Sequence, residues 1–308
     1  MTVLLASSAA LARTVKNPAV TVEAEYGAFV AEGTRYTAAH HQKTGPNGGD
    51  QPAPCIDRKI PTCNEHEIIL ISHIDLDTVG GVMRAQGRMA LFSGFDHRLD
   101  LFWNAAAFVD TNGPHKLRES HPMFGPMAAW WAWLTENRPR FDAAHKVVDV
   151  TGFMDRCYHT LSSLLLMPPD SKTRMELIEK GEAFVKAGKA LNKSSFIGAQ
   201  VTQNEKIVIA RKSDQFVNHL YVLPGLGIEA DCVCALNTET KKITLSFRDN
   251  GETINACDMV RRVWADKDED GNYLAGGHPG IAGTPRGKRQ GLAGLWGLVH
   301  TVVFTYES

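Results

Sequence analysis

The sequence predicts an α/β protein in which a mostly parallel N-terminal sheet is followed by a helical connector and a smaller α/β C-terminal domain with a mixed sheet. Three observations predict this fold class. Short apolar runs at residues 68–71, 105–109 and 146–148 alternate with helix-compatible stretches, as strands of an open parallel sheet do. After residue 192 the pattern changes to closely spaced alternating strands. The length of 308 residues, at about 150 residues per domain, favours two domains.

Composition and charge exclude several classes of protein. The chain has 33 Lys+Arg and 34 Asp+Glu, and its formal net charge of -1 is not that of a protein that binds long duplex nucleic acid electrostatically. The 6 cysteines form no C-x-x-C pair, which favours a reduced, cytoplasmic protein. The uncharged stretch 291–304 is too short to cross a membrane easily. We therefore expect a cytoplasmic protein with a short or small partner and no membrane contact.

In the N-terminal part, alternating patterns at residues 20–24 and 26–36 predict two strands, and residues 44–54 predict a loop. The β-branched run 68–71 predicts a strand that is buried on both faces, and residues 82–91 a helix after it. These elements precede two further predicted strands, each of which is followed by an aspartate.

Two further apolar runs each end in a carboxylate, since residues 105–109 precede Asp110 and residues 146–148 precede Asp149. The site of an open α/β sheet lies at the carboxyl ends of its strands. We therefore expect these acidic strand ends to converge.

The second half of the chain begins with a long amphipathic helix from Ser171, which predicts the connector. We expect strands at 203–210, 232–237 and 243–247, a helix at 254–264, and a buried closing strand at 302–304. The predicted parts of the chain are an N-terminal extension (1–64), a metal-binding domain (65–170), the connector (171–192) and a substrate-binding domain (193–308).

The strongest chemical signal is the segment 72–81, SHIDLDTVGG, directly after the strand at 68–71. In extended backbone, side chains two residues apart share one side, which places His73, Asp75 and Asp77 together. Such a group is costly to bury without a divalent cation, and its oxygen-rich ligands favour Mn²⁺ or Mg²⁺. We expect the two glycines that follow, Gly80 and Gly81, to let the chain turn tightly into the next helix.

The segment 72–81 resembles the first motif of the DHH phosphoesterase superfamily. Residues 276–283, GGHPGIAG, resemble the GGH..AAG signature of the DHH-associated C-terminal domain, and residues 243–248, ITLSFR, resemble the S-x-R strand of the same domain. The resemblance covers residues 65–305. Two motifs in the family's order, in a chain long enough for both domains, are more specific than either motif alone.

The resemblance implies a Mn²⁺-dependent phosphoesterase, with two ions and with Mg²⁺ as the alternative metal. Its substrates would be short oligonucleotides, cyclic or linear dinucleotides, or related phosphate esters, hydrolysed in an interdomain cleft. On this resemblance His73 and Asp75 hold one ion, Asp77 holds the other, and Asp110 bridges the two. Asp75 and Asp110 are then the catalytic carboxylates, together with His278 from the C-terminal signature.

One departure from the family is the Asp-His-His triplet, which the sequence lacks. His115 is the nearest substitute for its imidazole, with His97 and His121 as other candidates. Asp149 or Asp155 would be the last metal-binding aspartate. Loss of the triplet leaves open an alternative function, that of a noncatalytic protein that binds a nucleotide or a metal ion without turnover.

In the C-terminal domain the resemblance assigns substrate binding to Arg248, Gly276, Gly277 and His278. Arg286, in a short basic run, is a further candidate for the flanking phosphates. The same signature also resembles a domain appended to alanyl-tRNA synthetases. That function, aminoacyl-ester editing, leaves the segment 72–81 without a role.

The N-terminal histidines carry two further hypotheses. His40 and His41 could form a zinc site with Cys55, Cys63 and His66, although no pair has standard zinc spacing. The loop after them could alternatively be a lid that brings His40 or His41 to the substrate. The sequence leaves their role open, as it does homodimerisation.

Overall fold

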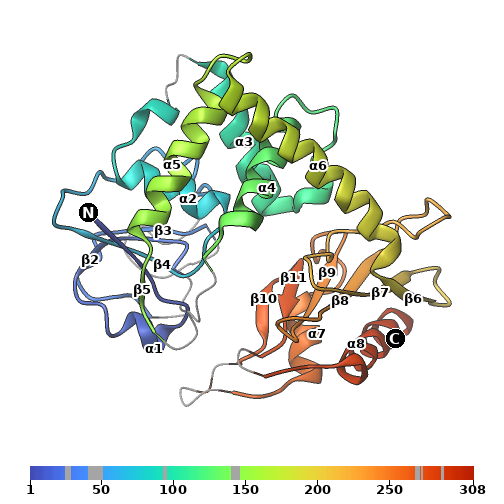
Figure 1. Cartoon of the computed structure of the whole chain (residues 1–308). Helices are drawn as coiled ribbons and strands as arrows, with labels where there is room; N and C mark the ends of the chain where they lie inside the picture. Colours follow the sequence, from blue (N-terminus) through green and yellow to red (C-terminus); the bar gives the residue numbers. More distant parts are fainter. Residues whose placement is uncertain are drawn as a thin grey trace. The chain divides into compact units, whose positions relative to one another are not determined.

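The computed structural model describes residues 1–24, 29–40, 51–92, 96–139, 146–267, 271, 273–285 and 288–308 (Figure 1). The chain divides into two compact units, residues 1–185 and 186–308. The division falls within helix α6 (Lys172–Ser194), the long helix that the sequence predicts as a connector.

The described residues of unit 1 form a five-stranded sheet with the order β3-β2-β4-β1-β5. Its strands are β1 (Thr2–Leu5), β2 (Pro18–Val22), β3 (Tyr36–Ala38), β4 (Ile68–Ile71) and β5 (Val148–Asp149). β1 to β4 pair in parallel, and β5 pairs antiparallel with β1. The predicted α/β class with a mostly parallel sheet is confirmed. Residues 1–64, expected as an extension, contribute β1, β2 and β3 to this sheet.

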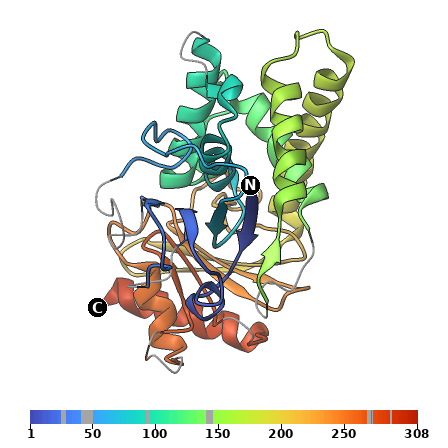
Figure 2. The ribbon, with the colours of Figure 1, turned by 90° about the vertical axis from the view of Figure 1, so that its left-hand side faces the viewer.

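Both faces of the sheet are covered, as the uninterrupted apolar sequence of β4 requires. Ile69 and Ile71 pack in the core that includes helices α2 (Leu76–Ala85) and α5 (Thr151–Leu165). Leu70 packs on the opposite face in a cluster with α1 (Ala9–Ala12). Figure 2 shows β5 continuing directly into α5 at the edge of the sheet. The strand ends that carry polar residues are thus held by a core on either side.

The predicted strand at 105–109 is wrong, because these residues lie in helix α3 (His97–Asn112). Alanine has the highest helix propensity, so the Ala105–Ala107 run favours a helix, which Asp96 caps by accepting a hydrogen bond from the N–H of Arg98 at 3.0 Å. The remaining elements of unit 1 are η1 (Met89–Phe92), η2 (Pro114–Lys116) and α4 (Phe124–Asn137).

Two other predicted elements are displaced. The strand expected at 26–36 begins only at Tyr36, where β3 starts, and residues 25–28 lie outside the described residues. The helix expected at 82–91 starts earlier, at Leu76, and ends at Ala85.

Unit 2 contains a six-stranded mixed sheet with the order β10-β11-β9-β8-β7-β6, in which β7 and β8 are the parallel pair. The strands are β6 (Phe196–Val201), β7 (Ile207–Ser213), β8 (Cys232–Asn237), β9 (Ile243–Phe247), β10 (Gly276–His278) and β11 (Ile281–Gly283). The predicted strands at 232–237 and 243–247 are confirmed. The strand expected at 203–210 is β7, and β6 precedes it.

Helices α7 (Ala256–Val263) and α8 (Leu292–Glu307) cover one face of this sheet (Figure 1). The predicted closing strand at 302–304 is wrong, because it lies in α8. Leu295, Leu298, Val299 and Val302 are fully buried, and their spacing of three and four residues is that of a helix face. Within the described residues, no helix combines the length and apolarity that a membrane crossing needs.

Candidate metal centre

The parallel strands β2, β3 and β4 end at the same level of the sheet. Val22 is in register with Ala38 of β3 and with Ile71 of β4. Glu23 directly follows β2, and His40 follows β3 by two residues. Polar side chains therefore lie together at this edge, but they are not the predicted set: Glu23 and His40 come from the N-terminal strands, Asp110 lies in helix α3, and Asp149 ends the antiparallel strand β5.

Four side chains meet there, and we call them the His40 cluster: Glu23, His40, Asp77 and Asp110. His40 Nδ1 lies 3.6 Å from Glu23 Oε1 and 3.7 Å from Asp77 Oδ2. Its Nε2 lies 3.0 Å from Asp110 Oδ2. One ligand atom from each of Glu23, His40 and Asp77 lies within 4.8 Å of the others, which is a spacing that a single cation can bridge.

Glu23 reaches the cluster through an unusual backbone conformation. Its φ of 47° is left-handed, a region that a residue with a long side chain seldom adopts. Hydrogen bonds hold it there, since its N–H donates to Ala38 O at 2.9 Å and its carbonyl accepts from the Ser72 hydroxyl. Glu23 is only 2% exposed, so a strained backbone places a carboxylate in the interior.

Asp77 is positioned by close packing of α2. A Cβ on Gly80 would lie 2.4 Å from Cys55 Cβ, and one on Gly81 would lie 2.6 Å from Val22 Cγ1. The two glycines therefore lie inside the helix and let it approach its neighbours, rather than turning the chain before it as expected. At this distance the Cys55 N–H donates to Asp77 Oδ1 at 2.8 Å.

Electrostatics in the cluster disfavour the ionised form of Asp77. Burial, followed by the charges of Asp110 and Asp75, raises the pKa of Asp77 to about 8. Its second oxygen, Oδ2, is buried and accepts no hydrogen bond from the described residues. A divalent cation would neutralise these carboxylates, and the donor set of two carboxylates and one imidazole suits Mn²⁺, Mg²⁺ or Zn²⁺.

Asp110 contacts the other ring nitrogen of His40. In metal sites, a ligating histidine usually donates its other ring N–H to a carboxylate, which fixes the tautomer and the ring orientation. Asp110 Oδ2, at 3.0 Å from His40 Nε2, has this placement. The four residues thus fit a cation held by Glu23, His40 and Asp77, with Asp110 orienting the histidine.

His73 and Asp75 form a separate pair, with 3.0 Å between His73 Nε2 and Asp75 Oδ2. Asp75 also caps α2 by accepting a hydrogen bond from the Thr78 N–H at 2.8 Å. Desolvation raises the pKa of Asp75, but His73 and the bond from Thr78 more than offset it, so the pKa lies below its usual range. The expectation of one shared side holds for His73 and Asp75. The extended backbone ends at the helix cap, so its alternation of sides does not reach Asp77, which lies in the first turn of α2.

Two other predicted metal ligands of unit 1, His115 and Asp149, are not part of the His40 cluster. His115 lies in η2, after the end of α3, and is half-buried. Asp149 is exposed at the end of β5 and accepts a hydrogen bond from the Thr151 N–H at 2.9 Å, which places it at the start of α5. Neither belongs to the group of three ligand atoms.

The residues of the predicted zinc site do not form one group of metal ligands in the part of the chain that the structure describes. Burial, followed by the charge of Asp77, raises the pKa of the Cys55 thiol well above its usual range. Burial also raises the pKa of Cys63 to about 11. His66 is an exposed residue 3.1 Å from Glu65 Oε1. Only His40 of this set belongs to the cluster, and His41 lies outside the described residues.

In unit 2, the basic residue of the S-x-R strand is paired with two carboxylates. Arg248 Nη1 donates to Glu229 Oε2 at 3.1 Å, and Nη2 lies 3.9 Å from Asp231 Oδ1. Its Nε donates to Ala230 O at 3.0 Å. The guanidinium is therefore held by acidic residues of its own unit.

The glycine signature forms a tight hairpin between β10 and β11. Gly276 pairs with Gly283, and His278 at the end of β10 pairs with Ile281. Gly277 has a φ of 155°, and a Cβ there would lie 2.4 Å from Ile281 O. Arg286 lies outside the described residues. The hairpin itself thus explains why glycine is needed at position 277.

Sequence reasoning missed Glu23 and assigned His40 to other roles. The strand that ends before Glu23 is visible as the alternation at 20–24, and β3 leads into His40. The signal was therefore a polar residue at the end of each strand, which is the same pattern that singled out the segment after β4.

No family model matches the chain, and no curated protein matches it either. A solved structure of an exopolyphosphatase-related protein from Bacteroides fragilis is similar, with 12% identity, a TM-score of 0.35, and 89% of this chain and 64% of that chain covered. An uncharacterized protein from Helicobacter pylori G27 shows 10% identity, a TM-score of 0.22, and coverage of 78% and 69%. The chain thus spans 64% of the length of the first.

Proposed function

We propose that the chain is a metal-dependent phosphohydrolase with its metal site at the carboxyl ends of β2, β3 and β4. The observation that carries the proposal is the group Glu23, His40 and Asp77, whose ligand atoms lie within 4.8 Å of one another. The segment 72–81, which resembles the first DHH motif, supports the phosphoesterase class. We propose Mn²⁺ as the metal and short oligonucleotides, dinucleotides or related phosphate esters as substrates.

In this proposal each residue of the cluster has a separate task. A divalent cation held by Glu23, His40 and Asp77 would supply Lewis-acid chemistry, polarising a phosphoryl oxygen and making water a better nucleophile. Glu23 and Asp77 supply negative oxygen ligands, and His40 binds through Nδ1. Asp110, with Oδ2 3.0 Å from His40 Nε2, would orient the ring so that the Nδ1 lone pair faces the position between Glu23 and Asp77.

His73 and Asp75 are the accessible pair beside this cluster, with side chains that are 37% and 39% exposed. We propose that they bind a second ion, in agreement with the two-metal chemistry that the family resemblance implies. Substrate binding by Arg248, Gly276, Gly277, His278 and Arg286 remains part of the proposal. For Arg248, a phosphate would have to compete with Glu229 and Asp231.

A Mn²⁺ titration of the metal-stripped protein tests the proposal. We expect tight binding by the wild type and a loss of about 100-fold or more in affinity for Glu23→Gln and for Asp77→Asn. Glu65→Gln is a matched control, because it removes a carboxylate 3.1 Å from the exposed His66 and should leave Mn²⁺ binding unchanged. Unaltered binding by both cluster variants would contradict the metal site.

The same proteins are then assayed with Mn²⁺ on a short oligonucleotide, a cyclic dinucleotide and pyrophosphate. Hydrolysis of at least one substrate by the wild type and by Glu65→Gln, but not by the cluster variants, is the expected result. Mn²⁺ binding without hydrolysis of any substrate would favour the noncatalytic binding protein instead.

A further inference from the structure

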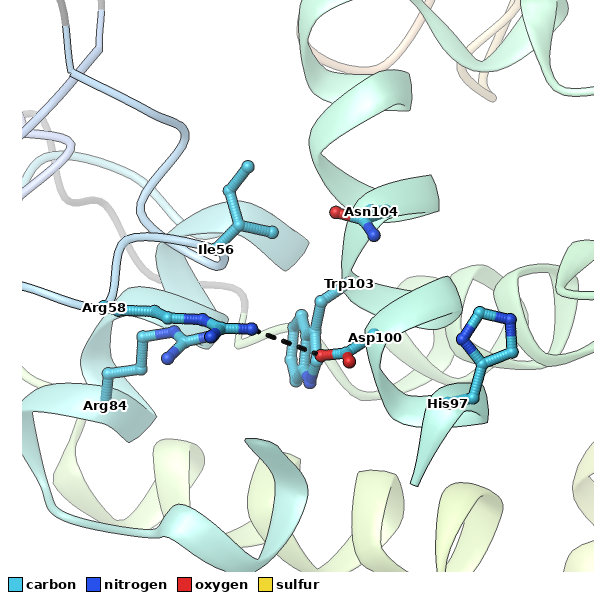
Figure 3. Close-up of a pocket in the computed structure, with 7 residues that line it drawn as sticks. All are labelled: Ile56, Arg58, Arg84, His97, Asp100, Trp103 and Asn104. Atoms are coloured by element: carbon cyan, nitrogen blue, oxygen red, sulfur yellow. Dashed lines mark ion pairs between the residues drawn. The ribbon is translucent and has the colours of Figure 1, made fainter. Parts of the chain in front are cut away.

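A cavity of about 430 Å³ lies in unit 1, and we call it the Arg84 pocket. Its walls come from the segment after Cys55, from α2 and from α3 (Figure 3). It is lined by Ile56, Arg58, Arg84, His97, Asp100, Trp103 and Asn104. None of these residues belongs to the His40 cluster, so the metal site leaves the pocket without a role.

Arg84 is a buried cation whose guanidinium contacts the protein through Nε and through one face, that over Phe92. The residue is 9% exposed, its guanidinium carbon lies 4.0 Å from the centre of the Phe92 ring, and its Nε donates to Cys55 O at 2.8 Å. These contacts fix the plane of the guanidinium. Its two Nη nitrogens donate no hydrogen bond to the described residues, and the side chain points into the pocket towards Arg58 and Asp100 (Figure 3).

The second arginine of the pocket adds like charge. Arg58 lies beside Arg84 in Figure 3, with 79% of its side chain exposed. Burial lowers the pKa of Arg84, and the charge of Arg58 lowers it further, although Asp57 and Asp100 oppose this. Asp100 Oδ1 lies 3.8 Å from Arg58 Nη2, which is a loose ion pair. Two neighbouring guanidinium groups therefore face the pocket, and one carboxylate, that of Asp100, lies across from them (Figure 3).

Arg211 of unit 2 shows how this protein satisfies an arginine whose role is structural. It is fully buried, and its guanidinium donates to Leu220 O, Asn192 O, Ser195 Oγ, Asn192 Oδ1 and Val222 O. Every nitrogen of Arg211 has a protein acceptor, whereas in Arg84 only Nε has one. A buried guanidinium with both Nη groups open is a preformed fork for an oxyanion.

We propose that the Arg84 pocket is a binding site for a phosphate group, as inorganic phosphate or as the terminal phosphate of a larger ligand. The Nη groups of Arg84 bind two phosphate oxygens, Arg58 closes over them as a mobile second cation, and the Asn104 amide donates from α3. The cavity is of a size that accepts a phosphate with part of the group that bears it. The proposal does not depend on the metal centre.

The backbone of Cys55 makes hydrogen bonds to both the pocket and the metal site. Its N–H donates to Asp77 and its carbonyl accepts from Arg84. Asp77 and Arg84 also belong to the same helix, seven residues apart, so both follow the position of α2. A structural defect in either site could therefore reach the other, and the test must separate them.

Calorimetric titration with phosphate and with pyrophosphate, in EDTA and in a buffer free of phosphate and sulfate, tests the proposal. The wild type should bind with one saturable site. Arg84→Lys, which keeps the charge but loses the fork, should bind about tenfold or more weakly, and Arg58→Gln several-fold more weakly. Asp100→Asn should bind more tightly, because it removes the carboxylate that competes for Arg58.

Arg88→Met is the matched control. Arg88 also lies over an aromatic ring, with its guanidinium carbon 4.4 Å from the centre of the Tyr158 ring, but it is paired with Asp155. The Arg88→Met variant should bind phosphate with wild-type affinity. The proposal is wrong if the wild type shows no saturable binding up to about 10 mM phosphate. It is equally wrong if Arg58→Gln and Arg84→Lys both match the wild type. Should Arg84→Lys misfold, wild-type affinity in Arg58→Gln, a variant of an exposed side chain, is enough to overturn the proposal. Because EDTA removes the metal, failure of the metal site would not change these results.

Discussion

The His40 cluster of unit 1 and the surroundings of Arg248 in unit 2 contain charged groups under opposite conditions. In the cluster, Glu23, Asp77 and Asp110 surround one imidazole, and Glu23 and Asp77 are buried. In unit 2, the guanidinium of Arg248 is matched by two carboxylates of its own unit. Where the chain leaves like charges facing one another, a ligand is needed to neutralise them. Where it pairs opposite charges, a ligand has to compete with carboxylates of the protein itself.

The pH dependence of stability is the largest expected expression of this difference. The pKa of Asp77 is raised from 3.8 to about 8 in the folded protein, so between these values the folded state holds a proton that the unfolded chain releases. In metal-free protein, the contribution of Asp77 to stability is therefore complete below about pH 4 and is lost as the pH rises through about 8. Each unit of such a shift corresponds to about 1.4 kcal/mol.

Thermal melts of the wild type and of Asp77→Asn in EDTA measure this effect, because asparagine does not titrate. We expect the wild type to lose stability relative to Asp77→Asn as the pH rises from about 5 to about 8. Mn²⁺ should reverse the loss in the wild type alone. Parallel curves for the two proteins would show that burial and the neighbouring carboxylates do not raise the pKa of Asp77.

Gly277→Ala tests the complementary claim, that the glycine signature of unit 2 is required by the hairpin. The new Cβ would lie 2.4 Å from Ile281 O at a φ of 155°, so we expect a loss of about 3 kcal/mol in the free energy of unfolding. Denaturant unfolding measures it. Mn²⁺ affinity, if it depends on unit 1 alone, should stay at the wild-type value, and a large fall would contradict that assignment. Gly188→Ala is a suitable control, because a Cβ at that position would meet no other atom within 4 Å. Gly271→Ala is not, because the φ of Gly271, 81°, is also left-handed.

Asp110→Asn should have a smaller effect on the metal site than loss of a ligand. Asparagine keeps the size of the side chain but removes the negative charge whose Oδ2 lies 3.0 Å from His40 Nε2 in the wild type. Orienting partners of this kind typically contribute 10- to 100-fold to metal affinity, and we expect Mn²⁺ binding to weaken within about that range. A loss as large as that of Asp77→Asn would instead indicate that Asp110 is a direct ligand, as the family resemblance implies.

Much of the fold could be predicted from local patterns. The strands at 232–237 and 243–247 were predicted at their observed limits because β-branched and apolar residues are bounded there by clear turns. The helix α3 was mistaken for a strand at 105–109, since a short apolar run does not distinguish a strand from a buried helix face. β1, with only four residues, was not predicted, although it lies inside the sheet between β4 and β5.

The site was less accessible to sequence reasoning because its members are distant in the chain. Asp77 and Asp110 could be named from their own neighbourhoods, but Glu23 and His40 become significant only through the pairing of β2 and β3 with β4. The role of Gly80 and Gly81 likewise depends on contacts with Cys55 and Val22, which no local pattern reveals. Parallel sheets make such sites hard to predict, since their neighbours are joined by long connections.

Arg248→Met is expected to have the smallest effect and bears most directly on the comparison. Its ion pairs are partly exposed, and Glu229 and Asp231 can be hydrated when the guanidinium is removed, so the free energy of unfolding should fall by no more than about 1 kcal/mol. If Arg248 also binds substrate, as we propose, KM should rise while Mn²⁺ affinity stays unchanged. Arg248→Lys keeps the charge but loses the bidentate geometry, so its KM should lie between that of the wild type and that of Arg248→Met. An unchanged KM in Arg248→Met would mean that this arginine is complete with its two carboxylates and takes no part in binding.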